Sequence, residues 1–362
     1  MRGSSLVQYC FLFPIAAVLT TPLKNSILPS ATPPLPLLIT GIAGVPGYNA
    51  LDYFRARYPG QVIGIRQRDN WRLVAPDIVP CNAEDRDELA RLFDEYGFRS
   101  VLDCAGNCAL RACELDTKLA WRINVEGAAN LLNVIGSADV RLVHLSCDLV
   151  FSGDRAGGYV EEDPTDPVTV YGTTMVAGEE LFRERAPQSC TLRISLPMGV
   201  SFNGHAGAID WIQSRFKKSK PATLYFDELR TPTYTDCLNE LCETLLCNRT
   251  SGLFHAGSPR KLTLYQIGQV INRVGGYAPQ HLMGCLRIKA GPIPPRAGDV
   301  SMDSSKLSRT LGYQPFDPWP FDEAWMPTHH DWHYERQPGE RGSRELLFEV
   351  LCRNPRRRRL SA

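Results

Sequence analysis

Leu35-Pro-Leu-Leu-Ile-Thr-Gly-Ile-Ala-Gly-Val-Pro-Gly47 is the stretch that decides the fold of this chain. Its first five residues form a short apolar run, which is typical of a buried parallel strand. Gly41, Gly44 and Gly47 then follow in GxxGxxG spacing, and residues 48–57 fit an amphipathic helix. Glycine allows a tight turn and a close approach to a pyrophosphate, while the helix N-terminus favours its negative charge. We therefore predict a dinucleotide-binding strand–loop–helix unit; the alternative is a glycine turn without a ligand.

Strands and helices alternate from this unit to about residue 200. This alternation predicts an α/β protein with a Rossmann-type, doubly wound parallel sheet and right-handed crossovers. The expected strands are 35–39, 61–65, 100–104, 141–145 and 191–196, and the expected helices are 48–57, 85–96, 117–135 and 175–185.

Beyond residue 200 the strands become fewer and the loops longer, which indicates a smaller C-terminal lobe for the substrate. Four units are expected: a disordered or targeting-like extension at 1–35, a nucleotide-binding domain at 36–200 with returning segments, a substrate-binding lobe at 201–317, and an unassigned tail at 318–362 with a basic end. Within the second lobe the expected helices lie in 204–220, 236–246, 264–274 and 304–311, and the expected strands at 222–226 and 253–256.

The composition is that of an ordinary soluble protein. The 362 residues include 43% hydrophobic and 22% charged residues and carry a formal net charge of +1, which favours neither nucleic acid nor a membrane as partner. Twelve cysteines are scattered without CxxC pairs, so we expect free thiols in the cytoplasm and no metal site. The apolar residues 6–19 leave export as the alternative.

The residues at the end of the second predicted strand indicate which cofactor is preferred. Folds specific for NAD place an acidic residue there, against the ribose diol. This chain instead has Arg66 and Arg68, and the planar guanidinium group suits a 2′-phosphate. We therefore favour NADP(H) over NAD(H); a solvated basic turn is the alternative.

A series of motifs gives a resemblance to a known family. The motifs, in order, are TGIAGVPG at 40–47, CAGN at 104–107, RINVEGAANLL at 122–132, HLSCDLVFSG at 144–153 and YVEEDPTDPVTVYGTTMVAGEE at 159–180. They resemble the extended short-chain dehydrogenase/reductases, in particular the dTDP-4-dehydrorhamnose reductase group. The resemblance implies reduction of a nucleotide-linked keto sugar with NAD(P)H, and it implies that Ala105 and Gly106 line the cofactor.

The resemblance also assigns the catalytic positions and shows where this chain departs from them. Tyr171 takes the position of the acid–base tyrosine. Met175 stands at the cofactor-facing position of the family's lysine, and Cys147 stands where the family has serine or threonine. Methionine has no charge and a thiol is a weak donor. We expect a weakened reductase whose catalytic residues are Tyr171 and Cys147, with a catalytic thiol nucleophile at Cys147 as a lesser alternative.

Two other functions remain open from the same residues. One is a catalytically impaired, nucleotide-binding regulatory subunit with a partner enzyme, similar to the β subunit of methionine adenosyltransferase. The other is an epimerase or dehydratase acting on a nucleotide sugar. Arg230 and Arg296 are the expected contacts to the substrate diphosphate, or else they form salt bridges that hold the two lobes together. The family's frequent dimerisation suggests a homodimer.

Overall fold

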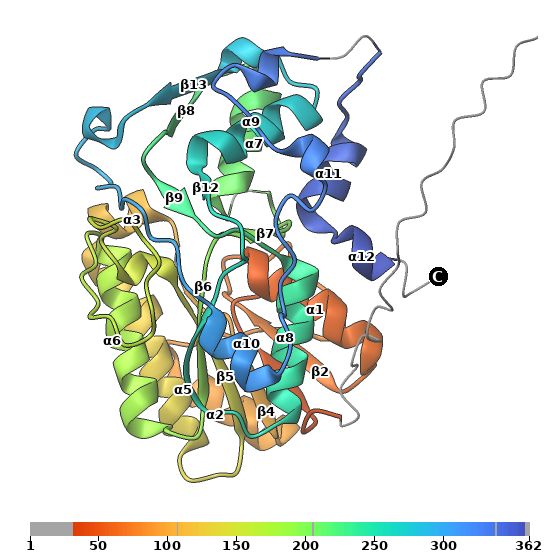
Figure 1. The fold of residues 1–362 in the computed structure, drawn as a ribbon. Helices are drawn as coiled ribbons and strands as arrows, with labels where there is room; N and C mark the ends of the chain where they lie inside the picture. Colours follow the sequence, from red (N-terminus) through yellow and green to blue (C-terminus); the bar gives the residue numbers. More distant parts are fainter. Residues whose placement is uncertain (1–31, 107, 205, 337–338, 359–362) are drawn as a thin grey trace, which may run out of the picture.

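A seven-stranded parallel sheet forms the centre of the first lobe in the computed structural model, which describes residues 32–106, 108–204, 206–336 and 339–358 (Figure 1). Its order is β11-β6-β5-β4-β1-β2-β3. The strands are β1 (Leu37–Ile39), β2 (Val62–Arg66), β3 (Ile78–Pro80), β4 (Ser100–Asp103), β5 (Arg141–Cys147), β6 (Cys190–Ile194) and β11 (Gly252–Ala256). The predicted Rossmann-type sheet is confirmed. The extension expected at 1–35 lies almost wholly outside the described residues.

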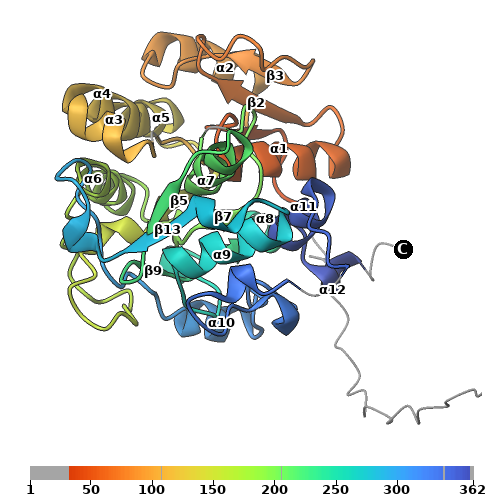
Figure 2. The same ribbon diagram turned by 90° about the horizontal axis from the view of Figure 1, so that it is seen from above.

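Helices cover both faces of this sheet because successive strand residues point to opposite sides. Leu37 and Ile39 face a core shared with α1 (Val45–Arg57) and α8 (Thr235–Cys247). Leu38 faces a second core, shared with the three helices α2 (Arg86–Tyr96), α5 (Gly127–Ile135) and α6 (Val170–Arg185). Figure 2 shows the two helical layers on either side of the strands.

Two expected helices differ from those observed. The helix expected at 117–135 follows α3 (Leu110–Leu115) and consists of α4 (Thr117–Trp121), a π-helical turn at Arg122–Glu126 and α5. The start expected at residue 175 is wrong, because the Thr169 hydroxyl accepts a hydrogen bond from the Gly172 amide at 3.0 Å and caps α6 at Val170. Tyr171 consequently lies in the first turn of a helix.

The second lobe is built from short sheets and helices above the carboxyl ends of the strands (Figure 1). Its paired strands are β8 (Ala222–Tyr225) with β13 (Leu282–Cys285), β7 (Pro197–Met198) with β10 (Thr233–Tyr234), and β9 (Leu229–Arg230) with β12 (Leu262–Thr263). Its helices include α7 (Ala208–Lys217) and α9 (Leu264–Val274). Within 201–317, α8 and β11 belong to the first lobe, since β11 extends the central sheet beside β6. Along the edge of β11 lies α10 (Ser305–Leu311).

The segment from residue 318 is folded onto this lobe. Trp319 is fully buried and its indole N–H donates to the Leu351 carbonyl at 3.2 Å. The helix α11 (Arg344–Cys352) contacts α9, and α12 (Pro355–Arg358) follows it. The short 3₁₀ turns of the described chain are Asp148–Val150, Pro279–His281, Arg287–Lys289, Glu323–Trp325 and Trp332–Tyr334. Among the helices of the described residues, none has the length and apolar content needed to cross a bilayer.

Candidate functional site

The glycine loop has the tight geometry that its sequence predicts. Gly41 has φ 63°, and a Cβ there would lie 2.2 Å from the Cys104 carbonyl oxygen. A Cβ on Gly47 would lie 2.5 Å from the Gly41 carbonyl oxygen, so α1 begins directly against the loop. Only glycine fits these two positions without moving the backbone.

Gly44 differs from its neighbours, and the difference indicates a ligand. A Cβ on Gly44 would meet only the Gly41 carbonyl oxygen, at 3.5 Å, which is ordinary contact. Packing within the chain therefore does not require glycine at this position. Gly44 is also the N-cap of α1, and no side chain caps the first turn of that helix. An open backbone in front of an uncapped helix N-terminus fits the pyrophosphate of a dinucleotide.

A buried hydrogen-bond network holds this loop to the neighbouring strand. The Thr40 hydroxyl donates to Asp103 at 2.5 Å and accepts from the backbone amides of Cys104 and Ala105 at 3.0 and 3.1 Å. The other carboxylate oxygen of Asp103 lies 2.8 Å from Nδ1 of His144, whose ring stacks on Phe182. This network fixes Ala105 beside the loop, where the sequence places it.

The two arginines expected at the 2′-phosphate are engaged within the protein. Arg66 donates to the carbonyls of Leu73 and Gln67 at 2.7 and 3.0 Å, and so closes the loop that follows β2. Arg68 forms an ion pair with the nearly buried Glu88, while its own side chain remains 60% exposed. Arg68 is thus the better placed of the two to reach a phosphate.

Tyr171 and Cys147 lie together beneath the second lobe. Both side chains are buried in one cluster, and the Cys147 thiol lies close enough to the Tyr171 hydroxyl to affect its pKa. Burial, followed by the nearby Cys147 and Cys108 thiols, raises the pKa of Tyr171 well above its usual value. Burial and then the charge of Asp148 raise the pKa of Cys147 to about 12. Both groups are therefore protonated at neutral pH, which argues against a thiolate nucleophile.

Ser146, the neighbour of Cys147, is engaged elsewhere in the interior. Its hydroxyl donates to Glu179 at 2.5 Å, and Glu179 is itself held by Arg193. Cys147 is thus the side chain of this strand end that contacts the phenol.

Met175 faces the segment that follows β4. Its sulfur lies 3.9 Å from the point where a Gly106 Cβ would stand, and the Asn124 amide oxygen lies at the same distance from that point. Asn124 itself donates to Thr174 at 2.8 Å from the π-helical turn. Tyr171 and Met175 lie one helical turn apart on the same face of α6. Met175 is the one that faces Gly106, and its side chain carries no charge.

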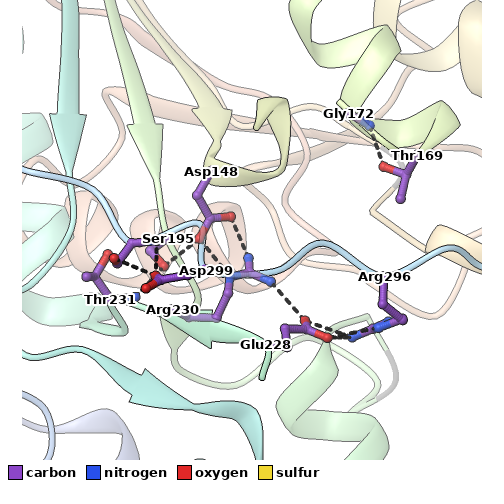
Figure 3. Close-up of polar contacts among 10 residues, drawn as sticks. Asp148, Thr169, Gly172, Ser195, Glu228, Arg230, Thr231, Arg296 and Asp299 are labelled. Carbon is purple, nitrogen blue, oxygen red and sulfur yellow. Dashed lines mark hydrogen bonds and ion pairs between the residues drawn. The ribbon is translucent and has the colours of Figure 1, made fainter. Parts of the chain in front are cut away.

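Arg230 lies in the interior of the protein, in contact with Asp148 (Figure 3). Its guanidinium donates twice to the fully buried Asp148 carboxylate, at 2.7 and 2.5 Å, and lies 3.6 Å from Glu228. The Asp148 carboxylate also accepts from Ser195 at 2.6 Å. The two carboxylates raise the pKa of Arg230 although burial opposes them, so it remains charged. These contacts match the alternative expectation for Arg230, that it forms a salt bridge which holds the two lobes together.

Arg296 is paired in the same way. Its guanidinium makes contacts of 2.9 and 2.8 Å to the Glu228 carboxylate oxygens, and its side chain is 17% exposed (Figure 3). One face of the guanidinium lies over the Tyr225 ring, with its central carbon 4.9 Å from the ring centre. Of the two arginines expected at the substrate, only Arg296 has a partly accessible side chain.

Comparison with known proteins places the chain in a family. The family model described as "RmlD substrate binding domain" matches residues 60–321. The chain belongs to this family. The match covers most of both lobes, from the second strand of the sheet to the start of the C-terminal segment.

The relatives of this RmlD-family chain are distant. A probable low-salt glycan biosynthesis reductase of Haloferax volcanii is 28% identical over 53% of this chain, and the match spans just under two-thirds (65%) of that relative. Methionine adenosyltransferase 2 subunit beta of Danio rerio is 24% identical over 82% of this chain and 95% of its own length. A Bacillus anthracis dTDP-4-dehydrorhamnose reductase, solved in complex with NADP, shares the fold at a TM-score of 0.64, with 20% identity, over 78% of this chain and 94% of the other.

Several residues of this RmlD-family site escaped the sequence analysis. Three polar residues make the hydrogen bonds and ion pairs at the junction of the lobes: Asp148, Glu228 and Ser195. Two others, Asp103 and His144, form the network that holds the glycine loop. A sequence signal existed for both carboxylates, because Asp103 lies within the buried strand predicted at 100–104 and Asp148 follows the one predicted at 141–145. Their partners were not predictable, since they come from segments 41 to 82 residues away.

Proposed function

We propose that this chain binds NADP(H) and reduces the keto group of a nucleotide-linked sugar, with Tyr171 as the proton donor. The observation that carries the proposal is the placement of Tyr171 in the first turn of α6, beside the ends of β4 and β5 and one helix turn from Met175. Gly41, Gly44 and Gly47 would hold the pyrophosphate, and Arg68 would contact the 2′-phosphate. When bound, the nicotinamide supplies hydride to the substrate carbon.

The proton step follows from the chain's own residues. Tyr171 is protonated at neutral pH, so it can donate to a carbonyl oxygen that becomes an alkoxide. Cys147 packs beside the phenol in the same buried cluster and so helps to position it. The groups that shift the pKa of Tyr171 most are Cys147, Cys108 and Asp148, and none of them is a cation. Proton transfer is therefore expected to be slow, by roughly 10²–10⁴-fold, the usual contribution of a tuned acid–base group.

A second candidate function is favoured by Met175. The uncharged thioether in the place of the family's lysine removes a group that activates the tyrosine, while the glycine loop remains open for a dinucleotide. A nucleotide-binding regulatory module would keep the second property and dispense with the first. The similarity to a methionine adenosyltransferase subunit beta supports this candidate.

The two candidates differ in a direct experiment. The purified chain is titrated with NADPH and NADH by fluorescence, and NADPH oxidation is then followed with dTDP-4-dehydrorhamnose. The reductase proposal predicts tighter binding of NADPH and slow turnover that disappears in Tyr171→Phe. Binding without turnover, in both the native chain and Met175→Lys, would favour the regulatory module. Failure to bind either nucleotide would refute both candidates.

A further inference from the structure

A hollow that no part of the proposed reaction uses lies beside the carboxyl end of the edge strand β11. Its volume is about 560 Å³, within the size range of small-ligand sites. Gly257 and Ser258, which follow β11 directly, line one side, and residues 301–305 and 308–309 line another. Four sheet positions separate β11 from β1, so the hollow lies roughly 19 Å across the sheet from the nucleotide loop.

The walls of the hollow carry hydroxyl groups able to donate hydrogen bonds. Ser304 accepts from the Gly257 amide at 2.9 Å, and Ser305 accepts from the Arg309 guanidinium at 2.9 Å. A serine hydroxyl that accepts such a bond keeps its own proton for an acceptor in the hollow. Both hydroxyl groups therefore keep a proton for a ligand acceptor.

The charged groups of the lining favour an anion. Lys261 and Arg309 are the two basic lining residues, and Asp303 is the acidic one, which leaves a net charge of +1 (two minus one). The Asp303 carboxylate is occupied by the Ser305 amide at 2.7 Å. Lys261 is paired with Asp299 at 2.8 Å, whereas Arg309 donates to the neutral Ser305 hydroxyl at 2.9 Å and keeps further N–H groups for a ligand.

A buried hydroxyl in the lining supplies an independent indication. Thr231 lines the hollow and is 4% exposed, and among the described residues its hydroxyl oxygen has no hydrogen-bond partner. A buried polar atom without a partner is costly, and a ligand group or water that reaches this hydroxyl would remove that cost. The Thr231 amide donates to Ser195 at 3.0 Å, and Ser195 donates to Asp148 (Figure 3). The lining is thereby tied to the junction of the two lobes.

We propose that this hollow is a second ligand site, which binds the phosphate group of a small phosphorylated metabolite. Arg309 provides the charge, since Lys261 is already paired with Asp299, and Ser304 and Ser305 provide hydroxyl donors. A tetrahedral phosphate offers acceptor oxygens in several directions, which suits donors supplied by Ser304 and by Ser305 and Arg309 of α10. The inference goes beyond the proposed function, because the hollow is separate from the glycine loop and from Tyr171.

The test measures binding of glucose 6-phosphate to the full chain by calorimetry at constant ionic strength, with and without saturating NADPH. We expect one site, unaffected by NADPH, and roughly tenfold weaker binding in Arg309→Gln, the usual consequence of losing a charge-assisted hydrogen bond. The matched control is Arg91→Gln, an exposed arginine on α2, at the opposite side of the molecule from α10 (Figure 2).

Glucose and inorganic phosphate identify the group that is recognised. If glucose and inorganic phosphate both bind more weakly than glucose 6-phosphate, the site recognises a phosphorylated metabolite. If inorganic phosphate binds as tightly as glucose 6-phosphate, the natural ligand is the free phosphate ion. Equal binding of glucose would overturn the proposal. So would displacement by NADPH, an unchanged affinity in Arg309→Gln, or the absence of binding to the native chain.

Discussion

The carboxylate of Asp148 and the guanidinium of Arg230 form a buried, two-point ion pair that joins the two lobes (Figure 3). Asp148 comes directly after Cys147, which contacts Tyr171, while Arg230 ends β9 in the second lobe. The geometry at Tyr171 is thereby connected to the orientation of the lobe that would hold the substrate.

Replacing Arg230 is expected to destabilise the protein strongly. Arg230→Met leaves the Asp148 carboxylate buried without its cation, and such a loss costs about 3–5 kcal/mol. Urea unfolding at pH 7 measures the change. Arg249→Met serves as the control, since Arg249 pairs with Asp139 at an exposed site where solvent screens the charges, and it is expected to change stability far less. Equal effects of the two variants would contradict a structural role for the Asp148–Arg230 pair.

The glycine loop allows ligand binding to be separated from folding. Gly44→Ala adds a methyl group where the chain leaves room, so we expect an unchanged melting temperature and NADPH binding weakened by roughly tenfold or more. Gly47→Ala places the same group 2.5 Å from the Gly41 carbonyl oxygen, so it should lower the melting temperature. Thermal unfolding and NADPH fluorescence are measured on both variants. Normal NADPH affinity in Gly44→Ala would remove the main support for the pyrophosphate site.

Met175→Lys is expected to raise the rate of NADPH-dependent reduction. A cation one helical turn from Tyr171 favours the phenolate and so lowers the pKa of the phenol towards neutrality. We expect an increase in kcat on the order of 10² and an alkaline limb that moves to lower pH. Met175→Leu keeps the apolar volume and should behave like the native chain. If the lysine and leucine variants give equal rates, the missing cation does not limit catalysis.

His255 should make stability fall with acidification. Its Nδ1 lies 2.9 Å from the Tyr159 carbonyl and its Nε2 lies 3.4 Å from Arg193, so a second proton would face a cation. Burial, and then the Arg193 charge, lowers the pKa of His255 to about 4. The unfolded chain takes up this proton near pH 6.5, whereas the native protein does not until about pH 4. The contribution of neutral His255 to the free energy of unfolding is therefore complete above pH 6.5 and is lost progressively between pH 6.5 and 4.

His255→Gln isolates this effect. Glutamine keeps hydrogen-bonding capacity and does not titrate, so the drop in the free energy of unfolding between pH 7 and pH 5 should shrink by about 2 kcal/mol. Urea titrations at the two pH values measure the difference. His329→Gln, at an exposed position, is the control and should leave the pH dependence nearly as it is in the native chain. An unchanged pH dependence in His255→Gln would show that His255 is protonated in the native state.

Local patterns predicted those elements whose residues carry their own signals. The strand before the glycine loop, the other strands predicted for the central sheet, and the helices α2 and α9 are found close to the expected residues, because apolar spacing and glycine positions are local properties. The start of α6 was placed too late. The capping residue Thr169 lies outside the apolar pattern, and the helix begins with Val170-Tyr-Gly, which has no strong helical signal.

The contacts that build the site depend on segments far apart in the chain. Asp103 meets His144 only because β4 and β5 are adjacent in parallel register, with these two residues opposite each other. Trp319 becomes fully buried only when the C-terminal segment returns to the second lobe. Neither relationship has a periodic signature in the sequence.

The sequence by itself determined a Rossmann-type α/β fold and the position of the glycine loop, and its resemblance to a family predicts that Met175 and Cys147 stand where that family has a lysine and a hydroxyl residue. Tertiary structure alone decided that Arg230 is paired with Asp148 in the interior, and that Tyr171 and Cys147 share a buried site in which both remain protonated. The physical reason is that residue type and spacing are set along the chain. Burial and charge pairing, by contrast, arise only when distant segments come together and exclude water.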